Sequence, residues 1–428
     1  MLNKFKQFFK QRNKDVLILM TGTVISQAVP LFATFVLTRL YTEVEFGLFQ
    51  VYFSISMILS VAVTFRYEMA IMLPEKEEDA RHILILSCLI SVLFSFSVFV
   101  AVLFFRNEFS LWLKQPNLKD SFFILPFTLL IIGIYQSFNY WSNRLKYYKQ
   151  LSLSRVARSM NSSILSIVFG MTSFFKHLGL IIGDTIGQTT SALFLVWKVL
   201  KLHPNLFKDV NWNKLKQVAI RYKKFPLFNV PSGFLEKLSG NLPALLMTPF
   251  FGIGVVGFFS LSQRMISLPG SVVARAMGDV FRQSATEAYN KDKNCKSLFI
   301  KTFKKLVVIS LPPFFIMFFV VQEVFVFAFG ENWREAGVYA QILMPMFLLQ
   351  FIGSPLSNMF LVTEKQKIDF LLQICLFLCI ILSIYLGYYY FDGPRETLML
   401  YCSVYSLKYV VELLLSYKFS KGTNYGTR

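Results

Sequence analysis

Charged side chains interrupt two long apolar stretches in the middle of the sequence, between Phe225 and Ala288. Glu236 and Lys237 lie about eleven residues into the first stretch and Arg264 about nine residues into the second, so the helical rise puts them near the centre of a bilayer. A charge at that depth is disfavoured by at least ~3 kcal/mol, and charges kept there normally face a wet cavity or a substrate. We therefore expect these two stretches to form much of the functional site.

Four further charges lie toward the ends of apolar stretches, at Arg66, Glu68, Arg275 and Asp279. Two interpretations are open for them. They line the same cavity as the central charges, or they extend to the membrane surface and pair locally.

The residue types predict the chemistry of the site. Arginine presents a planar fork of donors that suits phosphate oxygens, so a cavity rich in Arg and Lys favours an anion. We expect Arg264 and Lys237, helped by Arg66 and Arg275, to hold the phosphate of an anionic lipid-linked substrate. A carboxylate in the same cavity either balances these charges or carries a coupling ion, H⁺ or Na⁺, and the candidates are Glu236, Asp279 and Glu68.

Other charges within the spans have structural interpretations. Arg155 and Arg158 lie at the inner start of a span and are expected to extend to the membrane surface. Lys408 and Glu412 are four residues apart on the last span and are expected to neutralise each other.

The composition requires a membrane protein to position these residues. The 428 residues are 55% hydrophobic, and apolar runs recur along the whole length. We predict an all-α polytopic protein with about 12 transmembrane helices in two pseudo-symmetric six-helix lobes around a central cavity. A barrel would instead show short alternating segments. The predicted spans are Val16–Thr38, Phe46–Phe65, Ile83–Phe105, Phe122–Tyr140, Leu153–Ser173, Leu178–Leu200, Phe225–Phe250, Val255–Phe281, Leu306–Phe329, Val338–Val362, Phe370–Tyr390 and Thr397–Tyr417.

The net charge of +20 follows membrane topology rather than nucleic-acid binding. Lys and Arg gather in alternate short loops, which predicts that the N- and C-termini are both cytoplasmic. The longest hydrophilic segment lies at the midpoint of the chain. We therefore predict an N-terminal lobe of residues 1–200 with a basic N-terminus, a cytoplasmic linker of residues 201–224 and a C-terminal lobe of residues 225–428.

The two halves echo each other in sequence. The stretch LTRLYTEVEFGLFQVYFSISMILSV, which begins at Leu37, resembles LMTPFFGIGVVGFFSLSQRMISLPG, which begins at Leu246. Gly47 falls on Gly257 at an offset of 210 residues. Both motifs run in the same direction through the membrane, so the repeat is parallel and the cavity is expected on the axis between the halves.

Three motifs together resemble the oligosaccharide flippase (Wzx-like) family of polysaccharide transporters, within the multidrug/oligosaccharidyl-lipid/polysaccharide exporter superfamily. They are SQAVPLFATFVLTRLYTEVEFGLF (Ser26–Phe49), FRYEMAIMLPEKEEDA (Phe65–Ala80) and the pattern FPLFNVPSGF…LPALL…FFG…GFFSLSQRMISLPGSVV…AMGDVFRQ (Phe225–Gln283). Lys237 beside Glu236 departs from the pattern, which favours small polar residues there. The resemblance implies translocation of an undecaprenyl-pyrophosphate-linked oligosaccharide from the cytoplasmic to the outer leaflet. It also implies ion-coupled alternating access in the synthesis of O-antigen, capsule or exopolysaccharide, with a polysaccharide polymerase as a possible partner.

Two other functions compete with this interpretation. A membrane polymerase or ligase acting on the same lipid-linked sugars would need a large outer loop with acid or base groups, whereas the longest outer loop expected is Arg106–Ser121. The three His and five Cys show no metal-binding spacing and no Walker-type loop is present, so we expect neither an enzyme nor a cofactor. A multidrug exporter of the same superfamily would favour acidic and aromatic groups for organic cations.

Overall fold

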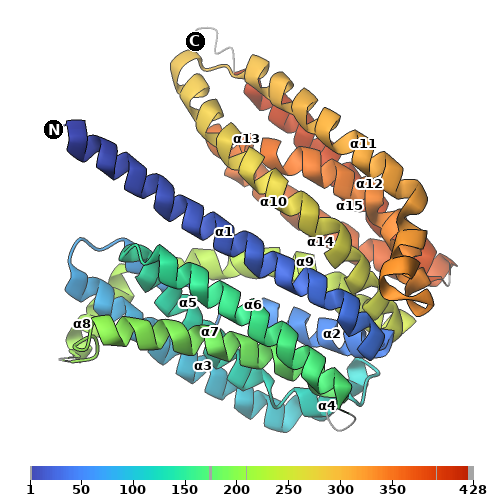
Figure 1. Cartoon of the computed structure of the whole chain (residues 1–428), viewed down its shortest axis with the longest axis horizontal. Helices are drawn as coiled ribbons and strands as arrows, with labels where there is room; N and C mark the ends of the chain where they lie inside the picture. The colour runs from blue at the N-terminus through green and yellow to red at the C-terminus, as the bar shows by residue number, and fades with distance from the viewer. Residues whose placement is uncertain (1, 173–175, 209, 392, 423–428) are drawn as a thin grey trace. The chain divides into compact units, whose positions relative to one another are not determined.

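The chain folds into helices throughout, as a computed structural model shows (Figure 1). The structure describes the backbone of residues 2–172, 176–208, 210–391 and 393–422, and their side chains except those of residues 2–17, 19, 20, 176, 269, 271 and 272. No strand occurs in these ranges, which confirms the predicted all-α class. The longer helices are α1 (Leu2–Leu40), α2 (Glu43–Leu59), α3 (Glu77–Trp112), α5 (Leu125–Arg144), α6 (Tyr148–Met171), α7 (Gly179–Leu202), α8 (Trp212–Arg221), α9 (Val230–Phe251), α10 (Ile253–Asp292), α11 (Lys296–Phe329), α12 (Arg334–Leu356), α14 (Gln366–Phe391) and α15 (Pro394–Ser420). The short elements are η1 (Tyr67–Met72), α4 (Leu118–Ser121), η2 (Lys176–Leu178), η3 (Phe225–Asn229), η4 (Glu331–Trp333) and α13 (Met359–Val362).

Each predicted span overlaps a helix, but the count of about twelve transmembrane helices is not confirmed. In the described part of the chain, eight helices are long and apolar enough to cross a membrane. The four predicted spans outside this group fall on α2, which has 17 residues, and on α6, α9 and α10. Charged and polar residues on α6 and α9 lower the mean hydropathy of these helices, and they include Glu236 and Lys237. The described stretch Ile253–Leu268 of α10 is apolar but shorter than a membrane span.

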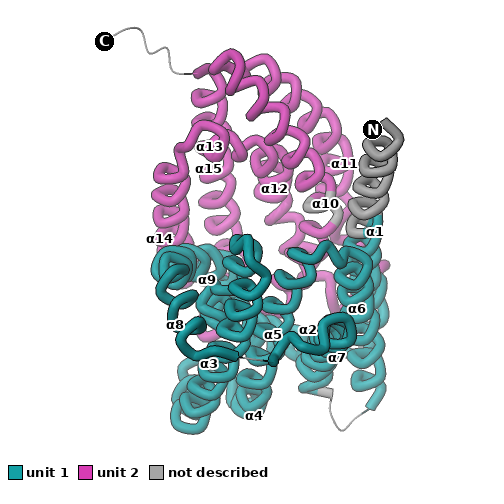
Figure 2. Tube along the Cα trace, turned by 90° about the vertical axis from the view of Figure 1, so that its left-hand side faces the viewer, with its two compact units in different colours: residues 1–245 teal, residues 246–428 magenta. Residues whose placement is uncertain are grey.

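The chain divides into two compact units, Met1–Leu245 and Leu246–Arg428 (Figure 2). In unit 1, α6 packs against α1 and α7, while α5 packs against α2, α3 and α7. In unit 2, α12 packs against α10, α11 and α15, and α14 packs against α15. The predicted residue limits of the lobes and linker, and the cavity between the lobes, remain predictions.

The helix order and several packing partners repeat between the two halves of the sequence: α5 packs against α3 and α7 as α12 packs against α11 and α15. The chain breaks between α1 and α2 at Tyr41–Thr42 and between α9 and α10 at Gly252, positions that coincide in the sequence repeat. At the first break, the backbone N–H of Thr42 donates to the Glu45 carboxylate at 2.7 Å, which caps the start of α2. At the second break, Gly252 has a φ of +88°, a conformation that glycine adopts without strain.

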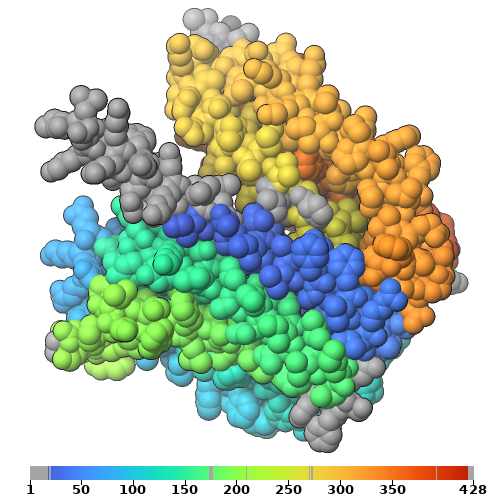
Figure 3. Space-filling model, viewed as in Figure 1, coloured from blue at the N-terminus to red at the C-terminus, as the bar shows by residue number. Residues whose placement is uncertain are grey.

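The outer surface of α11 shows how such helices meet the membrane. Phe315, Ile316, Phe319 and Phe327 are all more than half exposed, and α11 occupies much of the orange surface in Figure 3. A soluble protein rarely exposes an apolar face of this kind, whereas lipid tails are as apolar as the side chains themselves.

Candidate functional site

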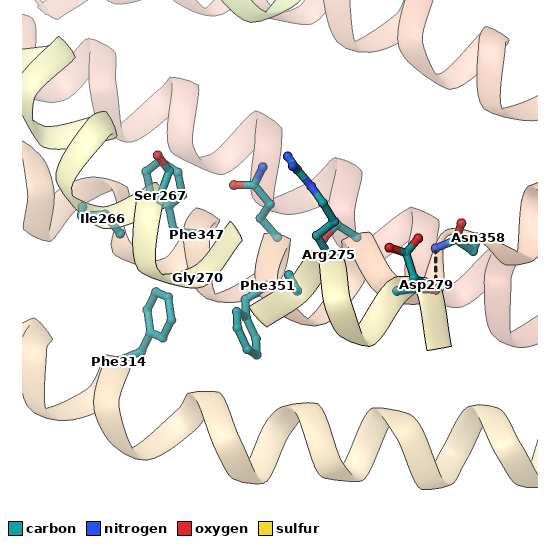
Figure 4. A pocket seen from close by; sticks show the side chains of 13 residues that line it. Ile266, Ser267, Gly270, Arg275, Asp279, Phe314, Phe347, Phe351 and Asn358 are labelled. Carbon is teal, nitrogen blue, oxygen red and sulfur yellow. Dashed lines mark hydrogen bonds between the residues drawn. The ribbon is translucent and has the colours of Figure 1, made fainter. Parts of the chain in front are cut away.

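A cavity of about 340 Å³ lies in unit 2 and contains two of the residues predicted from the sequence, Arg275 and Asp279 (Figure 4). One wall is a face of α10, and the others come from α11, from α12 and from Asn358 in the turn between α12 and α13. The lining residues are Ile266, Ser267, Gly270, Ala274, Arg275, Gly278, Asp279, Phe314, Phe347, Gln350, Phe351, Ser354 and Asn358.

The helical spacing of α10 brings its polar residues to the cavity. Arg275 and Asp279 are four residues apart and therefore share one face of the helix. Gly278 lies between them, and its carbonyl accepts a hydrogen bond at 3.5 Å from the side-chain amide of Asn358. The same amide donates to the Pro355 carbonyl at 2.9 Å. These two bonds hold the end of α12 against α10 beside Asp279.

The electrostatics of the cavity favour an anion. Asp279 is already paired, because Arg282 lies 3.4 Å from its carboxylate. Within the described part of the chain, the Arg275 side chain makes no hydrogen bond or ion pair. Figure 4 shows it extending away from the rings of Phe314 and Phe351. Its donor fork is therefore available to an anionic group, while the rings give the cavity an apolar side.

A second charged cluster lies in unit 1, where the chain turns out of α2. Phe65 and Arg66 both have left-handed backbones, with φ of 49° and 62°. Such conformations strain a residue that carries a side chain, and they are often found at functional sites. An Nη atom of Arg66 lies 3.9 Å from the Glu68 carboxylate, and Glu68 also accepts a hydrogen bond from the Thr64 hydroxyl.

The Arg66 guanidinium is enclosed by helix α9. A Cβ atom at Gly233 would overlap Nη2 of Arg66 and would lie 3.2 Å from its Cζ and 3.2 Å from Cγ1 of Val61. The Nε atom of Arg66 is buried and has no hydrogen-bond partner among the described residues. Helix α9 begins directly after the π-helical turn η3, a distortion that is frequent at functional sites. The absence of a side chain at Gly233 thus leaves the space that Arg66 occupies.

Burial governs the protonation of Glu68, which lies in η1 outside the long helices. Only 1% of its side chain is exposed. Burial raises the pKa of this carboxyl above its ordinary value, while the hydrogen bond from Thr64 and the charge of Arg66 act in the opposite direction.

The structure places the predicted residues in separate groups. Arg66 and Glu68 are together in unit 1, and Arg275 and Asp279 are together in unit 2. Lys237 is half-buried and Glu236 exposed on α9, and they form no ion pair with each other. Arg264 is half-buried on α10 and does not line the unit 2 cavity. The substrate and ion-coupling roles of all seven residues remain predictions.

Two other charge clusters complete the description. Lys408 and Glu412 form the expected pair on α15, with 2.7 Å between their charged atoms. Arg158 pairs with Asp184 at 3.5 Å between α6 and α7, which the sequence did not predict, because residues on different helices give no signal in a single sequence. Gln188 donates to the same Asp184 carboxylate at 2.7 Å. Among the described residues, no group of three or more His, Cys, Asp or Glu could hold a metal ion.

The fold is similar to the folds of solved membrane transporters. The structure is similar to a solved multidrug resistance MATE family transporter of the MOP superfamily in an inward-facing conformation, with a TM-score of 0.67, 15% identity and 93% of each chain covered. It is also similar to the lipid II flippase MurJ in an inward closed conformation, with a TM-score of 0.74 and 15% identity over 94% of this chain and 87% of that chain. The chain is thus an all-α, multi-pass membrane protein.

The chain belongs to the polysaccharide biosynthesis protein family, whose model matches residues 36–338. Its relatives include the teichuronic acid biosynthesis protein TuaB of Bacillus subtilis (strain 168), which is 24% identical over 58% of this chain and 50% of that protein. The lipopolysaccharide biosynthesis protein WzxC of Escherichia coli (strain K12) is 21% identical over 82% of this chain and 69% of that protein. The chain thus matches half the length of one curated relative and about two thirds of the other. The Wzx-like resemblance seen in the sequence is confirmed.

Proposed function

We propose that this protein is a flippase for an undecaprenyl-pyrophosphate-linked oligosaccharide, which it moves from the cytoplasmic to the outer leaflet. The product would serve the synthesis of a surface polysaccharide such as O-antigen, capsule or exopolysaccharide. Membership of the polysaccharide biosynthesis family and a fold similar to that of a lipid II flippase support this proposal. The single observation that carries it is the cavity lined both by Arg275, which has no ion partner in the described chain, and by the aromatic rings of Phe314, Phe347 and Phe351.

The cavity suits a charged and amphiphilic substrate. Pyrophosphate oxygens would accept hydrogen bonds from Arg275, and Arg264, Lys237 and Arg66 would add positive charge elsewhere on the path. Gln350, Ser267 and Ser354 line the same cavity and offer hydrogen-bonding groups that suit sugar hydroxyls. Glu236, Asp279 and Glu68 are the candidates for coupling to H⁺ or Na⁺, and the buried Glu68 suits a proton best of the three because burial favours its neutral form.

The proposed setting follows from the chemistry of this substrate. The protein would lie in a bacterial inner membrane with cytoplasmic termini, and a polysaccharide polymerase on the outer side would consume the product. No enzymatic step is assigned to the chain itself.

A leaflet-resolved assay tests the function. Proteoliposomes that contain the full chain and a labelled undecaprenyl-pyrophosphate oligosaccharide are treated with a membrane-impermeant reagent that modifies the sugar. We expect the protein to expose inner-leaflet substrate to the reagent, and we expect Arg264→Ala and Lys237→Ala to slow this exposure at equal protein levels. Parental rates in both variants would remove these two residues from the site. Absence of any exposure by the parent protein would refute the flippase proposal.

Two outcomes would favour the competing functions. A polymerase or ligase would extend the labelled oligosaccharide without moving it between leaflets. A multidrug exporter would transport an organic cation and ignore the lipid-linked sugar. The unit 2 cavity is less suited to an organic cation, because its one carboxylate, Asp279, is already paired with Arg282.

A further inference from the structure

A second cavity, with almost entirely apolar walls, lies in unit 1 between α2, α3, the start of α5 and α9. Its volume is about 410 Å³. Twelve of its thirteen lining residues are hydrophobic, and the remaining residue is Arg106. The floor is formed by buried side chains that include Ile58, Val102 and Leu125, whereas Phe105 on the rim is 65% exposed. We call this cavity the α3 groove.

The α3 groove follows one face of α3 for about three turns. Val98, Ala101, Val102, Phe105 and Phe109 all line it, and their spacing of three and four residues places them on a single stripe. At the helical rise this stripe is about 16 Å long. The groove is therefore long and carbon-lined, a form that suits a hydrocarbon chain better than a compact polar molecule.

Arg106 supplies the one charge of the α3 groove. Its guanidinium carbon lies 4.2 Å from the centroid of the Phe123 ring, a stacking contact that orients the guanidinium. Within the described residues no carboxylate pairs with this arginine. An arginine without a carboxylate partner beside apolar walls favours an anionic group that is joined to a hydrocarbon chain.

We propose that the α3 groove binds the polyprenyl tail of the lipid-linked substrate, with Arg106 against the phosphate end of that tail. The inference rests on the proposed function for the identity of the lipid. The substrate has a hydrocarbon tail and a polar head that holds all its hydrogen-bonding atoms. The described lining of the groove matches this division, because it is hydrophobic except for Arg106. On the predicted orientation α3 runs outward, so this tail belongs to substrate that has reached the outer half of the membrane.

Photocrosslinking tests binding without any need for transport. The full chain is reconstituted with undecaprenyl phosphate that carries a diazirine on its tail, in an excess of unlabelled phospholipid. We expect label on the residues of the α3 groove, and we expect less label in Ala101→Trp, whose indole would fill the groove. Val100→Trp is the matched control, because Val100 is adjacent on α3 and lies outside the groove. Arg106→Gln should weaken labelling by undecaprenyl phosphate about tenfold, since a lost charge-assisted hydrogen bond costs that much affinity.

A transport measurement separates the tail from the rest of the substrate. The same oligosaccharide pyrophosphate is offered on an undecaprenyl and on a short geranyl chain. Ala101→Trp should slow flipping of the long-chain substrate about tenfold, because the indole would keep about two methylene groups of the tail from being buried in the groove. The rate for the short-chain substrate should not change. Val100→Trp should change neither rate.

Several results would overturn the proposal. Equal labelling of the groove by a diazirine phospholipid would mean that bulk lipid fills it. Equal slowing of both substrates by Ala101→Trp would mean a general structural defect.

The binding site and the proposed function can also be separated. If the parent protein shows no flipping, and undecaprenyl phosphate still labels the groove selectively, the proposed function fails while the binding site stands.

Discussion

Replacing Gly233 by alanine tests whether the position of Arg66 matters for function. The added methyl group would overlap Nη2 of Arg66 and press on Val61, so the guanidinium must move away from its place beside Glu68. Gly240 is the matched control, because it lies on the same helix and a Cβ added there would have no neighbouring atom within 4 Å.

The two substitutions should differ in stability. In an unobstructed helix, Gly→Ala stabilises by about 0.5–1 kcal/mol, and we expect this gain at Gly240. At Gly233 the guanidinium is the flexible end of its side chain and can shift, so the opposing cost comes from its lost position beside Glu68 and from the 3.2 Å approach to Val61, and it offsets this gain. Gly233→Ala should therefore have a lower midpoint of thermal inactivation in detergent than Gly240→Ala. Transport should fall in Gly233→Ala alone, since only this substitution displaces Arg66.

A double variant isolates the cause. In an Arg66→Ala background the guanidinium is absent, so Gly233→Ala should lose most of its stability penalty, with a coupling of roughly 0.5–3 kcal/mol. Transport should stay low, because the arginine is still missing from its position. The reasoning is refuted if Gly233→Ala and Gly240→Ala behave alike, or if the penalty at Gly233 persists undiminished without Arg66.

Two further predictions concern unit 2. Arg275→Gln should slow flipping about tenfold or more, the usual effect of losing a charge-assisted hydrogen bond. Lys291→Gln, on the same helix but outside the cavity lining, should change the rate less, and a reversed order would exclude Arg275 from the site. Lys408→Met should destabilise the protein by about 3–5 kcal/mol, because it leaves the Glu412 carboxylate, whose side chain is 4% exposed, without its partner. Combining Lys408→Met with Glu412→Leu removes both charges and should recover most of that loss. Thermal inactivation of the three proteins measures this difference, and a double variant no more stable than Lys408→Met would contradict it.

Hydropathy and periodicity predicted the helices well, because each span must bury or expose a continuous apolar surface in the membrane. They predicted the number of transmembrane helices less well. Helix α9 is the clearest case, since Glu236 and Lys237 lower its mean hydropathy. The charges that identify a helix as functional are the same charges that make it a weaker transmembrane segment.

Contacts between helices were harder to predict than the helices themselves. The pair Lys408–Glu412 was predictable because both residues lie on one helix at a known spacing. The pair Arg158–Asp184 was not, because it depends on the register of α6 against α7. Arg106 was assigned to a loop, whereas α3 continues beyond it to Trp112, and these further turns of helix place the arginine at the α3 groove.

The sequence repeat places an arginine soon after the second helix motif of each half, yet the two arginines have different surroundings. Arg66 lies beside the Glu68 carboxylate, and its guanidinium occupies the space left by the missing side chain of Gly233. Its backbone is in the strained left-handed conformation. Arg275 lies on a regular helix and lines a cavity, while its neighbour Asp279 is paired with another arginine. Duplicated positions that perform one task would be expected to keep one environment. We therefore propose separate tasks. Arg275 would contact the anion directly, whereas Arg66 would add positive charge to the path from a guanidinium whose position is fixed against α9 and the turn that follows α2.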